Sequence, residues 1–404
     1  MNAKTTALTS LVIALLIAVG VADVYATYTV FTSRFPGAND FYRPWAGTRL
    51  WLTEGISPYS SEATTQIEIG MYGRPAKPDE DPGLLSYPFY TLFLIIPLAF
   101  LPYAWVEAIW LTLLEFALIG SVIGSIRLAG WRMSPGLLAV TLVWSLLFYH
   151  NARAILLGQF AVLVFAFVVW VLLALRARHD AWAGVALALS TAKPQMVFLF
   201  VPLVLLWAVA RRRWQVVIAF GVTMGVWLAV SFIFMPGWAS DFVREMLRYP
   251  SYTAIGSPVW IITRYFFPVF GAPGEIILSI LLCVWMLTTW WPLWRDKSWS
   301  AFLWVVGVTH IVTNLIVLRT ATTNYVVLLI PLAQVLAMIY ARWKRWGLGA
   351  VIGLELILLV GLWALFFVTV VHKFEHPIMY LPLPVGLAAA LLAWRKQLQQ
   401  VHPA

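Results

Sequence analysis

Residues 182–214 read WAGVALALSTAKPQMVFLFVPLVLLWAVARRRW, and this stretch shows a pattern that recurs along the whole chain. Two apolar runs flank the polar segment STAKPQ, and three arginines follow the second run. Such runs can cross hydrocarbon only as helices, because each backbone group must find its hydrogen-bond partner within the segment. The stretch therefore predicts two membrane helices that are joined near Lys193 and Pro194 and end in a basic loop.

The composition extends this interpretation to the whole chain. Of the 404 residues, 62% are hydrophobic and 11% are charged, whereas soluble domains are about 25% charged. No water-exposed surface of any size can be made from these residues, so we predict an all-α polytopic membrane protein without a soluble domain. The apolar runs predict about twelve transmembrane helices, at 8–31, 104–126, 135–150, 159–175, 182–192, 195–210, 214–235, 274–294, 299–317, 325–341, 346–371 and 378–394.

Basic residues mark one side of the predicted membrane domain. Short loops between alternate spans carry most of the unopposed Arg and Lys residues, such as Arg211–Arg213 and Arg342–Arg345. The positive-inside rule then predicts a multi-pass protein of the plasma membrane with both termini in the cytoplasm. The net charge of +10 does not indicate a nucleic-acid partner, because these residues do not form one basic stripe.

Two segments are predicted to lie on the outer face of a single membrane domain that spans residues 1–404. The first, 32–103, should contain interfacial helices near Tyr42–Gly55 and Ala63–Met71, followed by the apolar stretch Tyr87–Leu101. Fifteen helical residues rise only about 22 Å, so this last stretch should lie in the interface or re-enter the membrane. The second outer segment is 236–272.

Asp40, in GANDFYRPW, follows the first predicted helix closely and lies among Phe41, Tyr42 and Trp45. A carboxylate among aromatic residues beside a bilayer can act as a general base. An Asn-Asp pair is also typical of turns and helix caps, and the residues alone leave both interpretations open. Glu54 and Asp23 are the rival acids.

Three polar residues beside apolar runs are candidate phosphate ligands. Lys193 precedes a proline between two spans, and Arg153 and Gln159 lie in NARAILLGQF. Cations at such positions can hold a phosphate group, although a long basic side chain can also simply reach the interface. Other charged side chains assigned to the outer face are candidate supporting or acceptor-binding residues, namely Arg43, Glu54, Arg264 and Arg319.

The sequence predicts no metal and no cofactor. Histidine and cysteine residues do not have metal-ligand spacing, and no nucleotide-binding fingerprint is present. The acidic run Asp79, Glu80 and Asp81 could coordinate a divalent cation, but the neighbouring Lys77 and prolines favour a solvated loop. The single cysteine, Cys283, excludes an internal disulfide.

Four stretches, in this order, resemble glycosyltransferase family 87, a family of polyprenyl-phosphate-sugar-dependent membrane glycosyltransferases. They are DFYRPWAGTRLWLTEGISPY (Asp40–Tyr59), YPFYTLFLIIPLAFLP (Tyr87–Pro102), the pair Gly158-Gln159, and residues 182–214 quoted above. Two departures are visible. Pro88-Phe89 stands where the family has Pro-Pro, and RTATTNYVVLLIP (Arg319–Pro331) stands where the family commonly has Trp with His, which leaves Arg319, Asn324 and Tyr325 as substitutes.

The resemblance implies a C-type membrane glycosyltransferase fold, in which the first outer loop bears the catalytic acid. It implies a lipid-phosphate sugar donor, with mannose or arabinose as the sugar, a glycolipid or cell-envelope glycan as the acceptor, and inversion at the anomeric carbon. On this interpretation Asp40 is the catalytic base, and Lys193, Arg153 and Gln159 bind the donor phosphate. The alternatives are a transporter or flippase of lipid-linked sugars, and a noncatalytic subunit of envelope assembly.

Overall fold

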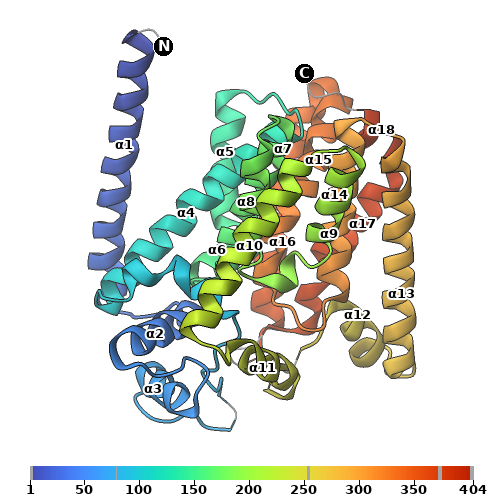
Figure 1. Ribbon diagram of the computed structural model, residues 1–404. Coiled ribbons are helices and arrows are strands. Elements are labelled where there is room, and N and C mark those ends of the chain that lie inside the picture. Colours follow the sequence, from blue (N-terminus) through green and yellow to red (C-terminus); the bar gives the residue numbers. More distant parts are fainter. Residues whose placement is uncertain (1–2, 79, 253–254, 372–374, 401–404) are drawn as a thin grey trace. The chain divides into compact units, whose positions relative to one another are not determined.

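The computed structural model describes residues 3–78, 80–252, 255–371 and 375–400, and most of them lie in helices (Figure 1). The longer helices are α1 Ala3–Thr27, α2 Asn39–Glu54, α3 Ser61–Tyr72, α4 Tyr103–Leu128, α5 Pro135–Leu147, α6 Tyr149–Leu156, α7 Phe160–Arg176, α8 Asp180–Ser190, α9 Phe200–Ala210, α10 Trp214–Phe234, α11 Trp238–Tyr252, α13 Gly271–Trp290, α14 Trp299–Ile316, α15 Leu329–Arg342, α16 Gly347–Thr369, α17 Pro382–Ala393 and α18 Arg395–Gln400. The short ones are α12 Pro258–Trp260, the π-helices η1 Tyr28–Thr32 and η5 Ile261–Phe266, and the 3-10 helices η2 Phe89–Leu94, η3 Ile96–Leu98, η4 Pro194–Met196, η6 Trp291–Trp294, η7 Thr322–Leu328, η8 Lys344–Trp346 and η9 Pro377–Tyr380.

The helices group into two compact units. Unit 1 comprises Met1–Leu85, Leu92–Phe116 and Ile155–Gln159, and unit 2 comprises Ser86–Thr91, Ala117–Ala154 and Phe160–Ala404. Helices α2 and α3 of unit 1 lie where the sequence predicts two helices. That residues 1–404 form one membrane domain, with outer segments at 32–103 and 236–272, stays a prediction.

The structure confirms an all-helical polytopic membrane protein. Among the described residues, seven helices are long and apolar enough to cross a membrane, and the pair α6 and α7, bent by 117°, makes an eighth. Four shorter apolar segments, Pro135–Leu147, Asp180–Ser190, Phe200–Ala210 and Pro377–Ala393, complete the correspondence with the predicted spans. By length and composition, seven or eight of these described segments can cross a membrane; that about twelve segments cross stays a prediction.

Several predicted boundaries shift where the backbone leaves the α-helical conformation. The predicted span 135–150 ends at Leu147, because Phe148 has an extended ψ of 129°, and α6 begins directly afterwards. The predicted span 195–210 begins only at Phe200, after η4. Proline removes backbone donors and favours such breaks. The apolar stretch Tyr87–Leu101 forms η2 and η3, and it is not one of the spanning helices.

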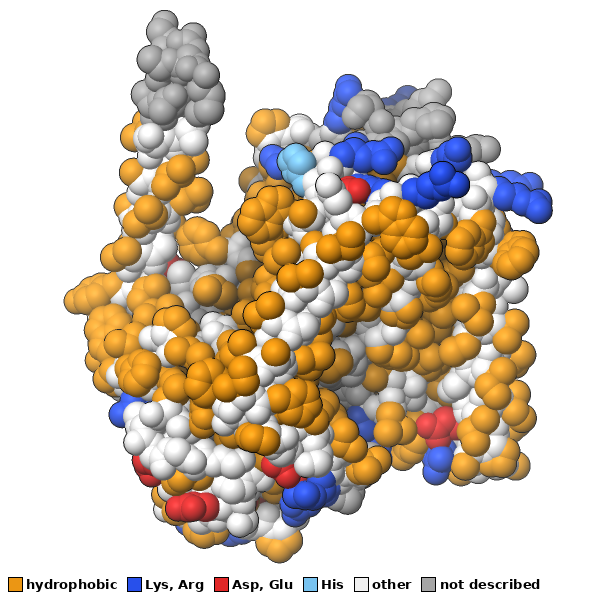
Figure 2. Space-filling view, in the orientation of Figure 1, with side chains coloured by type: hydrophobic (Ala, Val, Ile, Leu, Met, Phe, Trp, Pro, Cys, Tyr) orange, Lys and Arg blue, Asp and Glu red, His pale blue; other side chains and the backbone are white. Residues whose placement is uncertain are grey.

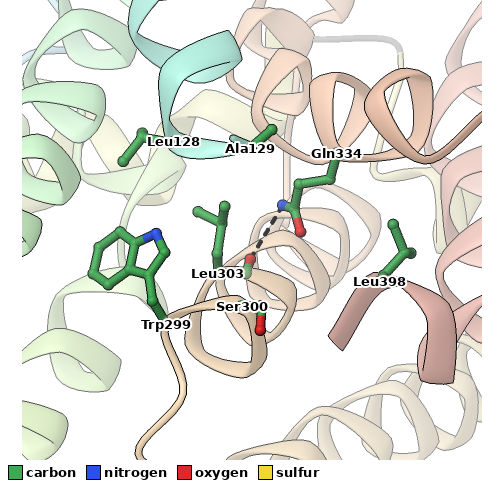
Figure 3. A pocket seen from close by; sticks show the side chains of 7 residues that line it. All are labelled: Leu128, Ala129, Trp299, Ser300, Leu303, Gln334 and Leu398. Atoms are coloured by element: carbon green, nitrogen blue, oxygen red, sulfur yellow. Dashed lines mark hydrogen bonds between the residues drawn. The ribbon is translucent and has the colours of Figure 1, made fainter. Parts of the chain in front are cut away.

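In unit 2, α14 and the continuous segment formed by η7 and α15 make up the interior, and nearly all of their residues are buried. Helix α8 packs between α7 and α10, and a Cβ at Gly184 would overlap Val216 and Ala219 of α10, so a small residue allows this close approach. Apolar side chains cover the outer surface of the long helices (Figure 2). Near Trp299 and Gln334, a cavity of about 20 Å³ (Figure 3) has room for about one water molecule and none for a sugar.

In unit 1, α1 and the first half of α4 are joined by specific contacts. The rings of Tyr28 and Trp105 stack with centroids 3.6 Å apart, and the Thr112 hydroxyl donates a hydrogen bond of 2.7 Å to Asp23. This hydrogen bond joins Asp23 of α1 to α4.

Candidate active site

A left-handed turn sets the direction of α2. Ala38 occupies the N-cap position with φ of 48° and ψ of 41°, and it has no side-chain acceptor for the free backbone N–H groups. The helix begins at Asn39, so Asp40 lies in its first turn. The Asp40 carboxylate is hydrogen-bonded to other side chains, as described next, so the Asn-Asp pair does not provide the N-cap residue of α2.

Two side chains hold the Asp40 carboxylate. Arg43 Nη2 donates to Oδ1 at 2.6 Å, and Gln159 Nε2 donates to Oδ2 at 2.5 Å. The side chains of Asp40 and Arg43 are 24% and 13% exposed. Each carboxylate oxygen can accept more than one hydrogen bond, so the group is fixed in direction and still able to accept a proton from a bound hydroxyl.

The acidic run that follows α3 is tied to arginines. Arg43 Nη2 also donates to Asp81 at 2.9 Å, and Arg74 donates two hydrogen bonds to Glu80, which lowers the pKa of Glu80 to about 2. Asp79 lies outside the described residues. Beside Arg43, burial raises the pKa of the Tyr42 hydroxyl. Arg43 itself connects Asp40 to the loop that contains Asp81.

One face of α4 fixes the backbone on both sides of Asp40. Tyr103, Glu107 and Trp110 are spaced four and three residues apart, so they share a face of the helix. The Tyr103 hydroxyl donates to the carbonyl of Gly37 at 2.9 Å, and Glu107 Oε1 accepts from the Gly37 N–H at 2.9 Å. Trp110 donates to the carbonyl of Gly158 at 2.9 Å. Glu107 lies within the predicted span 104–126, and nothing in the local sequence predicts its hydrogen bond to Gly37.

Gly158 lets the chain approach α2 closely enough for Gln159 to reach Asp40. Its φ is +65°, and a Cβ there would lie 2.6 Å from Phe41 Cβ and 3.0 Å from Ala38 Cβ. Phe41 is stacked on Trp110, with ring centroids 4.2 Å apart. Only glycine fits this space without displacement, so the predicted Gly158-Gln159 pair serves to orient the carboxylate partner.

Glu107 should therefore be a positioning residue. Glu107→Ala removes the acceptor for the Gly37 N–H, and we expect it to lower the transfer rate about tenfold, since an unmade buried hydrogen bond costs about 1–3 kcal/mol. Glu107→Gln keeps an acceptor oxygen and should restore most of the rate. The kcat and the donor KM of both variants provide the measurement, with KM unchanged; equal loss in both variants, or none in Glu107→Ala, would contradict this role.

In unit 2, Lys193 and Arg153 both contact the segment that contains η7. The Lys193 ammonium is almost fully buried and donates to Asn324 Oδ1 at 2.7 Å. Arg153 Nη1 donates to Thr322 Oγ1 at 3.2 Å. Two of the predicted cations are thus gathered around residues 322–324, and Asn324, the predicted substitute for a family residue, is the partner of one of them.

Arg153 is also the centre of a buried polar cluster. It forms an ion pair with Glu375, and the hydroxyls of Tyr149 and Thr322 each donate to Glu375 Oε1 at 2.5 Å. Glu375 was missed by sequence reasoning, because it lies 222 residues from Arg153 with no local pattern to join them. The sequence shows Glu375 only as an acidic residue shortly before the last apolar run.

The other candidate residues occupy different surroundings. Glu54 is exposed as the last residue of α2, and Arg264 is ion-paired with Glu275 at 2.7 Å. The Arg319 guanidinium lies over the Trp260 ring at 5.8 Å. Tyr325 is buried and donates to the carbonyl of Tyr380 at 2.8 Å, and its part in the site stays a prediction.

Residues 85–260 match the model of glycosyltransferase family 87. The matched range includes Arg153, Gln159 and Lys193, and Asp40 precedes it. No curated protein and no solved structure matches the chain. The match agrees with the resemblance noted in the sequence and, with the apolar helices, supports a glycosyltransferase embedded in a membrane.

Proposed function

We propose, from the match of residues 85–260 to glycosyltransferase family 87, that this chain transfers a sugar from a polyprenyl-phosphate donor to a hydroxyl group of a glycolipid or envelope glycan. The reaction takes place on the outer face of the plasma membrane, and the sugar is mannose or a sugar similar to arabinose. The observation that carries the proposal is the Asp40 carboxylate, held by Arg43 and Gln159 and still partly accessible.

The proposed chemistry is a single displacement. Asp40 takes the proton of the acceptor hydroxyl while that oxygen forms a bond to the anomeric carbon of the sugar. The bond between the anomeric carbon and the phosphate oxygen breaks, and polyprenyl phosphate leaves with the electron pair. Lys193 and Arg153 supply positive charge for the phosphate, and attack opposite the leaving group inverts the anomeric configuration.

Inversion can be measured directly. The purified protein is supplied with a β-linked polyprenyl-phosphate sugar and a glycan acceptor, and the anomeric configuration of the product is read by NMR. The proposal predicts an α-linked product. A β-linked product would require a different mechanism, and movement of intact donor across proteoliposomes without any transfer would favour the flippase alternative.

Lys193→Met should weaken donor binding about tenfold to a hundredfold, because a charge-assisted hydrogen bond is worth about 1.5–3 kcal/mol. Arg153 should be tested together with its partner, as Arg153→Met with Glu375→Gln, since removal of the arginine alone would leave a buried carboxylate uncompensated. Donor affinity is measured by lipid binding in detergent, and Lys77→Met, in an exposed loop, is the matched control. Unchanged affinity in both test variants would reject these residues as phosphate ligands.

A further inference from the structure

Unit 2 also contains an apolar pocket that shares no residue with the proposed transfer site. It is a pocket of about 210 Å³ lined by residues of α9, α13 and η6. Four of its lining residues are tryptophans, namely Trp207, Trp290, Trp291 and Trp294, and leucines supply most of the remainder. We call this feature the tryptophan pocket. Its walls are apolar, so a hydrocarbon chain suits it better than a sugar or a peptide.

The walls of the tryptophan pocket are fixed by contacts behind them. Trp207 stacks on Phe302 with centroids 4.4 Å apart, and the Arg213 guanidinium lies 5.1 Å from the Trp207 ring centroid. Trp290 donates its indole N–H to Thr309 Oγ1 at 3.0 Å. Trp291 and Trp294, at the open edge of the pocket, are 72% and 53% exposed. The pocket is therefore preformed on its inner side and open at its edge.

Positive charge gathers at one end of this pocket. Arg211, directly after the lining residue Ala210, donates to the carbonyls of Leu293 and Asp296, which brings the loops after α9 and η6 together. Arg212, Arg295 and Lys297 on these loops are exposed, and they have no ion pair within the part of the chain that the structure describes. Figure 2 shows Lys and Arg side chains gathered along one end of this unit, beyond the apolar surface.

The two carboxylates nearby do not neutralise this end. Asp180 is ion-paired with Arg213, and the Asp296 side chain accepts the backbone N–H of Ser298 at 2.8 Å. Apart from the pair of Arg213 with Asp180, the described loops after α9 and η6 carry four cations, Arg211, Arg212, Arg295 and Lys297, and one carboxylate, Asp296. Tryptophan is typical of the membrane interface, where a headgroup and the first part of an acyl chain lie.

We propose that the tryptophan pocket binds one anionic phospholipid of the bilayer. An acyl chain occupies the pocket, and the headgroup phosphate lies against Arg212, Arg295 and Lys297. Charge complementarity favours an anionic over a zwitterionic headgroup. Each cation near the phosphate should raise the affinity for the anionic lipid about fivefold. Because the pocket shares no residue with the proposed transfer reaction, the two proposals stand or fall separately.

Native mass spectrometry of the delipidated full-length protein tests the proposal. Phosphatidylglycerol and phosphatidylcholine with identical acyl chains are titrated, and bound lipid is counted. Wild type should bind one phosphatidylglycerol at concentrations where phosphatidylcholine does not bind. The triple variant Arg212→Gln, Arg295→Gln, Lys297→Gln should lose about a hundredfold in affinity, and Leu206→Trp, which fills the pocket from α9, should lose the bound lipid.

Matched controls separate this pocket from general attraction to the membrane. A control triple variant, Arg132→Gln, Arg178→Gln, Lys77→Gln, removes two arginines and one lysine from other exposed positions. Arg178 also has a positive φ of 62°, close to the 55° of Arg212. Leu356→Trp adds the same ring to another exposed site. Equal binding of both lipids, equal loss in the control variants, or undiminished binding in Leu206→Trp would each overturn the proposal.

Discussion

Asp40→Asn is expected to abolish sugar transfer, with a loss of about two to four orders of magnitude in rate, because removal of a general base typically costs that much. The substitution keeps the shape of the side chain. Asparagine can still accept a hydrogen bond from Arg43, and rotation of the Gln159 amide restores a donor and acceptor match with the new amide. Folding and donor binding should therefore remain close to wild type, as measured by thermal unfolding and lipid binding.

Glu54→Gln is the matched control for this prediction. Glu54 lies at the opposite end of the same helix and is exposed, so neutralising it should change the rate by less than about twofold, as is usual for exposed side chains. Asp23→Asn tests the remaining rival acid. Should Asp40→Asn retain near wild-type transfer while either control does not, the base is not Asp40.

Gly158→Ala is the second change with a large expected effect. A left-handed conformation costs a non-glycine residue about 1–2 kcal/mol, and the added Cβ must displace Phe41, whose Cβ lies 2.6 Å away. The displacement moves Gln159 and the first turn of α2, and a shift of about 1 Å at a reacting group can cost about a hundredfold in rate. We expect a transfer rate lowered about a hundredfold, measured at saturating donor.

Gly55→Ala separates backbone strain from displacement of the site. Gly55 also has a positive φ, +71°, but a Cβ there meets nothing within 4 Å. Gly55→Ala should therefore lower the free energy of unfolding by about as much as the backbone strain in Gly158→Ala does, while the transfer rate remains near wild type. If Gly55→Ala and Gly158→Ala lower the rate equally, strain alone explains the loss and Gly158 does not position Gln159.

Much of the fold follows from the sequence because long apolar runs have few alternatives. The predicted spans 214–235 and 299–317 correspond to α10, Trp214–Phe234, and α14, Trp299–Ile316. The sequence did not predict the short helix α6, Tyr149–Leu156, which lies largely between the predicted spans 135–150 and 159–175. The break after Leu147 and the 117° bend between α6 and α7 depend on single residues such as Phe148 and Gly158, whose conformations are set by packing.

The candidate site was only partly accessible to sequence reasoning. Asp40, Lys193 and Gln159 could be selected, since a polar residue beside an apolar run is costly and therefore conspicuous. The pairing of these residues could not be predicted, because pairs such as Lys193 with Asn324 and Arg153 with Glu375 join distant parts of the chain. Glu107 was visible as an acid within a span, but its hydrogen bond to Gly37 depends on how α4 packs.

The most direct test is to incubate the purified wild-type protein with labelled polyprenyl-phosphate mannose and polyprenyl-phosphate arabinose, in separate reactions, and to follow the label. We expect transfer to a glycan acceptor, or slow hydrolysis of the donor when no acceptor is present, with polyprenyl phosphate released in equal amount. A protein that leaves both lipid donors intact, yet transfers the same sugars from nucleotide donors, would contradict it.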